Sequence, residues 1–164
     1  MFTEKAFDNY DTILCNGKYH IDEIRQRENM EGLNKKKLIK SGYLYFDYLK
    51  NRIDDFKYNQ SEILIAPSWN KNEKYYINQD FSKIIKKLLE YNNKVRFRPH
   101  PETIKRFPKI IKNYNDLFKT QNFIIDDNPN NFESMQNAKY LITDNSGISI
   151  EFLLIFKKPV FFYT

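Results

Sequence analysis

Residues 140–163 read YLITDNSGISIEFLLIFKKPVFFY, and this stretch predicts a strand, a helix and a second strand. The first apolar run ends at residues 144–147, Asp-Asn-Ser-Gly, which are small or polar and favour a turn. A second apolar run continues to Phe156, and Lys157-Lys158-Pro159 separates it from a third. A strand–helix–strand unit with a crossover of this length indicates parallel strands in one sheet.

The rest of the chain repeats this alternation of strands and helices. Residues 62–68, EILIAPS, lack polar alternation, which is expected of a strand covered by helices on both faces. We therefore expect an α/β fold with a Rossmann-like, doubly wound parallel sheet. Strands are expected at 11–16, 36–43, 62–68, 94–100, 122–127, 139–144 and 159–164, and helices at 19–29, 44–56, 80–93, 101–118, 131–138 and 146–156.

The composition excludes several classes of protein. A chain of 164 residues with 41% hydrophobic and 16% aromatic residues is typical of a globular protein and not of a disordered one. The single cysteine, Cys15, excludes an intramolecular disulfide framework, and its apolar neighbours predict a buried structural thiol. No apolar run reaches the roughly 18 residues that span a bilayer, and the first residues lack a signal-peptide core. A soluble, cytoplasmic protein is expected.

The net charge of +6 is interpreted as a general bias in residue usage. Lys, Asn, Ile, Tyr and Phe are abundant throughout, and the densest basic run, residues 35–40, is interpreted as a solvated segment. We therefore expect no nucleic-acid partner.

Polar residues that follow the predicted strands mark the expected ligand site. In doubly wound sheets, ligands bind at the carboxyl ends of the strands. The residues just past four strands should therefore lie along one edge of the sheet. They are Pro67-Ser68-Trp69, Arg98-Pro99-His100-Pro101, Asp126-Asp127 and Asp144-Asn145-Ser146-Gly147.

The start of the helix after residue 145 predicts an anion site. Unpaired N–H groups and the positive end of the helix dipole meet there, and Gly147 allows a phosphate to approach the backbone. The Ser146 hydroxyl is expected to cap the helix or to bind the anion. Glu151 lies roughly 6–8 Å further along the axis, a spacing that suits the ribose of a nucleotide whose diphosphate lies at the helix start. The alternative is a capped helix with a surface glutamate.

Residues 98–101, Arg-Pro-His-Pro, form the second candidate cluster. Arg98 suits phosphate recognition, and His100 suits donation to a phosphate or general acid catalysis at the leaving group. Two prolines hold this turn extended at the same edge. The alternative is that His100 is structural, which is the commoner role of an isolated histidine.

Four segments together resemble the CDP-glycerol glycerophosphotransferase family. They are ILIAPSWNKN, VRFRPHPET, the acidic stretch IIDDNPNNFESMQNAKYLITDNSGISIEFLLIFKKPVFFY, and the upstream DTILCNGKYHIDEIR…LIKSGYLYFDYL. The resemblance implies a GT-B fold of two Rossmann-like lobes and a role in teichoic acid or capsule polymer synthesis. It implies a catalytic His100, a nucleotide diphosphate held at Asp144, Ser146 and Gly147, and Glu151 as the acid of the next helix. Ser68 and Arg98 are added to the nucleotide-binding set from their place at the edge.

The chain also departs from the family pattern. It has no His-Gly-Thr motif, which in the family supplies the other catalytic histidine from the N-terminal lobe. Residues 1–56 are interpreted as the end of that lobe and the crossover, and 57–164 as the nucleotide-binding lobe, truncated at its C-terminus. We expect this part alone to be inactive and to need the N-terminal lobe or a partner chain.

Three functions stay open on the sequence alone. The first is the donor lobe of a transferase that uses a CDP-linked donor and a polymer or glycan acceptor. It would need no metal or other cofactor and would work in the cytoplasm, with the inner membrane face as a candidate location. The second is a UDP-sugar-dependent GT-B glycosyltransferase or epimerase lobe. The third is a non-catalytic nucleotide-binding remnant.

Overall fold

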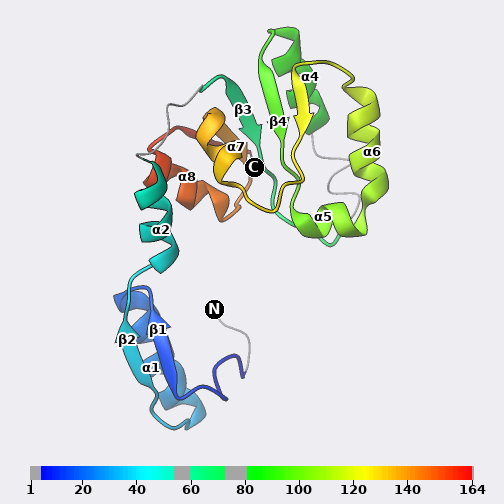
Figure 1. The fold of residues 1–164 in the computed structure, drawn as a ribbon. Helices are drawn as coiled ribbons and strands as arrows, with labels where there is room; N and C mark the ends of the chain where they lie inside the picture. Colours follow the sequence, from blue (N-terminus) through cyan, green and yellow to red (C-terminus); the bar gives the residue numbers. More distant parts are fainter. Residues whose placement is uncertain (1–4, 54–59, 73–80, 164) are drawn as a thin grey trace. The chain divides into compact units, whose positions relative to one another are not determined.

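The computed structural model describes residues 5–53, 60–72 and 81–163, which belong to two compact units, Met1–Arg52 and Ile53–Thr164. Each unit is built from parallel strands joined by helices (Figure 1). Within these described ranges, no helix has the length and apolar character needed to cross a membrane. The expected end of the helix 44–56, and most of the polar loop and helix start at 73–80, lie outside the described residues.

The first unit contains a β–α–β element. Strand β1 (Thr12–Cys15) pairs in parallel with β2 (Lys37–Lys40), and α1 (Lys18–Glu31) connects them. Ile13 and Cys15 point to the same side of β1 and pack with Ile24 of α1. The Cys15 thiol is therefore buried, as predicted, and burial raises its pKa. Helix α2 (Leu44–Ile53) follows β2.

The second unit contains five parallel strands in the spatial order β5-β4-β3-β6-β7. The chain starts in the middle of the sheet, adds two strands on one side, and then returns to add two strands on the other side. This is the predicted doubly wound parallel sheet. The strands are β3 (Glu62–Ile65), β4 (Lys94–Phe97), β5 (Phe123–Ile125), β6 (Ala138–Thr143) and β7 (Val160–Phe162).

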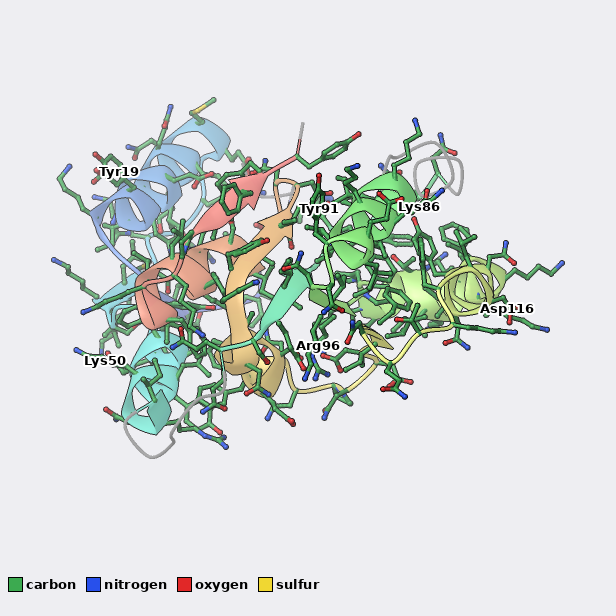
Figure 2. The ribbon with its side chains drawn as sticks, turned by 90° about the horizontal axis from the view of Figure 1, so that it is seen from above. Tyr19, Lys50, Lys86, Tyr91, Arg96 and Asp116 are labelled. Carbon is green, nitrogen blue, oxygen red and sulfur yellow. The ribbon has the colours of Figure 1, made fainter. Side chains whose placement is uncertain are left out.

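Helices cover both faces of this sheet. Helices α4 (Phe81–Glu90) and α6 (Pro108–Leu117) pack on one face, and α7 (Phe132–Asn137) and α8 (Ile148–Phe156) pack on the other (Figure 1). Ile63 and Ile65 of β3 join the first core, whereas Leu64 joins the second, because strand residues alternate between faces. The charged side chains Lys86 and Asp116 lie on the outer sides of their helices (Figure 2).

The predicted helix 101–118 is wrong in one respect, because the structure has two helices there. Helix α5 (Pro101–Arg106) stops before Phe107, and α6 begins at Pro108. Pro108 lacks an N–H donor, and its ring disfavours a helical conformation at Phe107, which has φ −126° and ψ 54°. The other predicted strands and helices are present, most of them shorter than predicted.

Lys158, in the turn before β7, is a buried cation at the end of α7. Its Nζ donates to the carbonyl oxygens of Met135 at 3.2 Å, Gln136 at 2.6 Å and Ala138 at 2.6 Å. Burial lowers the pKa of Lys158 to about 8, so the amine is an ammonium at neutral pH. Its three N–H donors match the three acceptors, and a cation at a helix C-terminus is stabilising. This contact fastens α7 to the segment between α8 and β7.

Candidate functional site

The carboxyl ends of β3 and β6 form the switch point of the sheet. These strands are neighbours, but the chain leaves β3 for helices on one face and leaves β6 for α8 on the other face. Ligands of doubly wound sheets bind at such a point. The four loops named from the sequence all follow parallel strands of this sheet, so they lie along one edge, as predicted.

Asp144 joins the two loops of the switch point. Its Oδ1 accepts the backbone N–H of Ser68 at 2.8 Å, and its Oδ2 accepts the Ser68 hydroxyl at 2.6 Å. Beside it, the Thr143 hydroxyl donates to the carbonyl oxygen of Ala66 at 2.6 Å. The sequence placed Ser68 and Asp144 at one site, and the structure brings them into contact. Their direct binding of a nucleotide stays a prediction, because both side chains here hold the loops together.

Gly147 leaves open space at the start of α8. Its φ of −58° and ψ of −26° are open to any residue, so the backbone does not require glycine here. A Cβ built at this position meets no atom of the described residues within 4 Å. Two N–H groups at the start of α8 have acceptors, since those of Ser149 and Ile150 donate to the carbonyl oxygens of Ser146 and Gly147, each at 3.1 Å. A side chain at residue 147 would occupy the open space beside this helix start. Anion binding by the remaining N–H groups stays a prediction.

The Ser146 hydroxyl was expected to cap α8 or to bind an anion. The N-cap residue of α8 is Gly147, which has no side chain with which to cap the helix. Instead, the Ser146 carbonyl accepts the Ser149 hydroxyl at 2.7 Å. Anion binding by the Ser146 hydroxyl stays a prediction.

Glu151 lies in the first turn of α8 and is half-buried. Asn131, at the start of α7, donates its Nδ2–H to Glu151 Oε2 at 3.4 Å. Phe152 is fully buried, but three apolar neighbours are exposed: Ile150, Leu153 and Leu154. Glu151 therefore lies at the border of the buried face, and its apolar neighbours do not enclose it as the sequence suggested. Its ribose role stays a prediction.

Arg98 is paired within the lobe. Its Nη1 donates to Asp126 Oδ2 at 2.8 Å, and its Nη2 donates to the carbonyl oxygen of Asn128 at 2.6 Å. The Ser134 hydroxyl and the Asn128 N–H also donate to the Asp126 carboxylate. Because the Arg98 and Asp126 side chains are only 11% and 6% exposed, Arg98 fixes the loop after β5 against β4. Phosphate binding by Arg98 stays a prediction.

The Asp126 carboxylate predicts acid sensitivity. Burial by itself raises the pKa of Asp126, but hydrogen bonds from Ser134, Asn128 and Arg98 hold it below its ordinary value. Such a carboxylate stabilises the fold above the unfolded-state pKa of about 3.9, and this stabilisation is lost as the pH falls through the folded-state pKa. We expect Asp126→Asn to lower the free energy of unfolding by about 3 kcal/mol at neutral pH.

Urea unfolding, measured at neutral pH and at a series of acid pH values, tests this expectation. The variant should lose less stability than the wild type below about pH 4, because its amide does not titrate. Asp116→Asn, which changes an exposed carboxylate on α6, is the matched control and should behave like the wild type. Equal acid sensitivity of Asp126→Asn and the wild type would contradict the stabilising role of the ionised Asp126 carboxylate.

His100 caps α5 with its ring. Its Nδ1 accepts the N–H of Glu102 at 3.1 Å, so in the neutral ring the proton lies on Nε2, on the side away from this bond. The ring centroid of His100 is 6.5 Å from that of Trp69, which directly follows Ser68. Because Ser68 is bonded to Asp144, these contacts link His100 to the switch point, as the sequence predicted.

Trp69 lies at the edge named from the sequence, but no role was predicted for it. Its ring stacks on Phe107 at 5.8 Å between centroids, and the Arg106 guanidinium carbon lies 5.5 Å from its centroid. The sequence feature that could have indicated a role for Trp69 is that it is the single tryptophan of the chain and follows Ser68 at a strand end.

The edge presents donors suited to an oxyanion. Hydroxyl groups, helix N–H groups and an imidazole Nε2–H donate well to phosphate oxygens. Among residues 5–53, 60–72 and 81–163, no group of three or more His, Cys, Asp or Glu side chains is placed to hold a metal ion.

The sequence profile of one protein family matches the chain from residue 3 to residue 164. This family is described as CDP-Glycerol:Poly(glycerophosphate) glycerophosphotransferase. The chain belongs to this family. The resemblance drawn from the sequence motifs is thereby confirmed.

Known proteins similar to this glycerophosphotransferase-family chain are longer than it is. The beta-lysine N(6)-acetyltransferase of Methanococcus maripaludis is 25% identical in an alignment 146 residues long, and the match covers 78% of this chain and 51% of that protein. A structure of the wall teichoic acid polymerase TagF has a TM-score of 0.56 and 21% identity, over 94% of this chain and 39% of that one.

A UDP-GlcNAc 2-epimerase of Methanocaldococcus jannaschii, in complex with UDP-GlcNAc and UDP, has a TM-score of 0.57 and 16% identity. The match covers 92% of this chain and 44% of the epimerase. At these identities the similarity shows the fold alone. Since both solved neighbours are of the GT-B type, the predicted fold class is confirmed.

Proposed function

We propose that this chain is the donor-nucleotide-binding part of a CDP-glycerol glycerophosphotransferase that acts in teichoic acid or capsule polymer synthesis. The observation that carries the proposal is the family match over residues 3–164. The geometry is compatible with it, because Ser68 is bonded to Asp144 and the His100 ring lies beside that of Trp69, at the edge where doubly wound sheets bind ligands.

The reaction proposed is transfer of a phosphoglycerol group. An acceptor hydroxyl oxygen attacks the β-phosphorus of CDP-glycerol, a new P–O bond forms, and the bond between the β-phosphorus and the bridging oxygen breaks to release CMP. The α8 N–H groups and the Ser146 hydroxyl bind the diphosphate, and the His100 Nε2–H donates to a phosphate oxygen as charge builds on the leaving group. The acceptor's proton passes to a base of the other lobe.

The proposed partners follow from the extent of the chain. It spans about half of its curated relative and about two-fifths of its solved neighbours. We therefore infer that a second lobe, in the same polypeptide or in a partner chain, supplies the acceptor site. We expect the assembled enzyme to need no further cofactor and to act in the cytoplasm, at the inner face of the membrane. The acceptor is a growing polymer or glycan.

Nucleotide binding by the purified chain tests the proposal. With one lobe of the cleft present, we expect CDP to bind with micromolar to millimolar affinity, roughly −8 to −4 kcal/mol, and more tightly than UDP. Calorimetry or ligand-observed NMR measures both. Tighter binding of UDP would favour the second candidate, a UDP-sugar enzyme, which the fold of the UDP-bound epimerase supports. Absence of binding by both at about 10 mM would contradict nucleotide binding by this lobe.

The predicted ribose contact of Glu151 gives a sharper test. We expect Glu151→Gln to weaken CDP binding by about tenfold and to weaken 2′-deoxy-CDP binding less, because the analogue lacks one hydroxyl that the carboxylate would accept. Calorimetry with both nucleotides measures the difference. Glu90→Gln, at the end of α4, is the control and should change neither affinity. Equal losses for the two nucleotides would remove Glu151 from the ribose site.

A further inference from the structure

Four residues around α5 form a closed ring of contacts that includes His100. The Glu102 N–H donates to His100 Nδ1, and the Glu102 carboxylate pairs with Arg106 Nε at 2.9 Å. The Arg106 guanidinium lies over the Trp69 ring, and the Trp69 ring faces that of His100 at an interplanar angle of 33°. Three of these residues come from the β4–α6 segment, and Trp69 comes from the loop after β3.

Of these four residues, Trp69 is the one that packs against the core, through Phe107. Its ring stacks on Phe107 at an interplanar angle of 25°, and Phe107 packs against the core between the sheet and the α4–α6 layer. Phe107 is itself fixed, because its N–H donates to the Thr103 carbonyl at 2.8 Å and Pro108 follows it. The Glu102–Arg106 pair is largely exposed, so it adds little rigidity by itself.

The break between α5 and α6 has a consequence for this cluster. Arg106 is the last residue of α5 and Phe107 is the turn residue before α6, and both side chains lie against the Trp69 ring. Aromatic rings with centroids 4.5–7 Å apart attract one another and restrict one another's rotation. The His100 ring is therefore held from two sides, by the Glu102 N–H at Nδ1 and by the Trp69 ring.

We propose that Trp69 is a positioning residue that holds His100 in the Nε2–H tautomer, with Nε2 directed to the ligand edge. This inference rests on the proposed function in one respect, which is that the acceptor of the Nε2–H is a phosphate oxygen of the donor nucleotide. The ring orientation itself is a property of the chain and is measurable without a nucleotide. Trp69 acts through His100 and through no contact of its own with the substrate.

Imidazole nitrogen NMR of the whole chain tests the proposal, since the protein has two histidines. At a pH where the His100 ring is neutral, we expect the wild-type ratio of the Nε2–H to the Nδ1–H tautomer to be about fivefold higher than in free histidine. This factor corresponds to the net free energy of one hydrogen bond. Trp69→Leu should bring this ratio within about twofold of free histidine, and Trp69→Phe should restore most of the enrichment because it keeps a ring. His20, in the first unit, is the internal control and should stay unchanged.

Two results would overturn the proposal. One is wild-type His100 with the tautomer ratio of free histidine, and the other is a folded Trp69→Leu variant with the wild-type ratio. If Trp69→Leu loses its fold, Trp69→Met replaces it, because methionine is a flexible apolar side chain without an aromatic ring. A wild-type His100 ratio in a folded Trp69→Met variant would equally overturn the proposal. Addition of CDP to the same samples reports separately on the proposed function, because failure to bind leaves the tautomer result intact.

Discussion

Replacing His100 by asparagine is expected to lower transfer of the phosphoglycerol group by about 10²–10³-fold while CDP still binds within a few-fold of wild type. Asparagine is among the best N-cap residues, so the substitution keeps an acceptor for the Glu102 N–H and removes the Nε2–H donor. The loss then reports on the donor, and α5 stays capped. Turnover of CDP-glycerol is measured with the second lobe present, in the longer polypeptide or as an added chain.

The matched control is His20→Asn. His20 is the other histidine, and its Nδ1 also accepts a backbone N–H, from Asn16 at 3.3 Å, but it lies in the first unit. We expect this variant to keep wild-type turnover. Near-normal turnover of His100→Asn would assign His100 a purely structural role at the start of α5 and would remove it from the transfer step.

Replacing Gly147 by valine is expected to weaken binding of CDP and of 2′-deoxy-CDP equally, by about 10²-fold or more, because the new side chain fills the space beside the α8 N–H groups. The fold should tolerate the change to within about 1 kcal/mol, since the backbone is in the ordinary helical region and the added atoms meet no described neighbour. Calorimetry measures the two affinities, and thermal unfolding measures stability.

Gly17→Val provides the comparison for this variant. Gly17 is the N-cap of α1, it also has open space at its Cβ position, and its φ of −178° is extended backbone. It belongs to the first unit, so CDP affinity should not change. If Gly147→Val binds both nucleotides as the wild type does, the diphosphate does not lie at the start of α8. A loss confined to one nucleotide would point to a sugar contact instead.

Features of this fold that depend on neighbouring residues were predictable from the sequence. Strand and helix order followed from hydrophobic periodicity, because neighbouring residues decide which faces of a segment are apolar. The four loops at the edge followed as well, since parallel strands necessarily place their carboxyl ends together. The break before Pro108 could have been predicted from the rules for proline. It was missed because the apolar residues on both sides of Pro108 suggest one continuous helix.

The sequence by itself determined the order of the elements, the doubly wound class and the family, because these depend on local pattern and on motifs read in order. Only the tertiary structure decided which polar side chains meet. Ser68 and Asp144 are 76 residues apart and are bonded because β3 and β6 are neighbours, and Arg98 turns to Asp126 because β4 and β5 are neighbours. The contact of Trp69 with His100 has the same origin. Hydrophobic periodicity indicates which face of a segment is buried. The partner of a buried polar group depends instead on which strands pair, and that pairing is decided by residues that are distant in the chain.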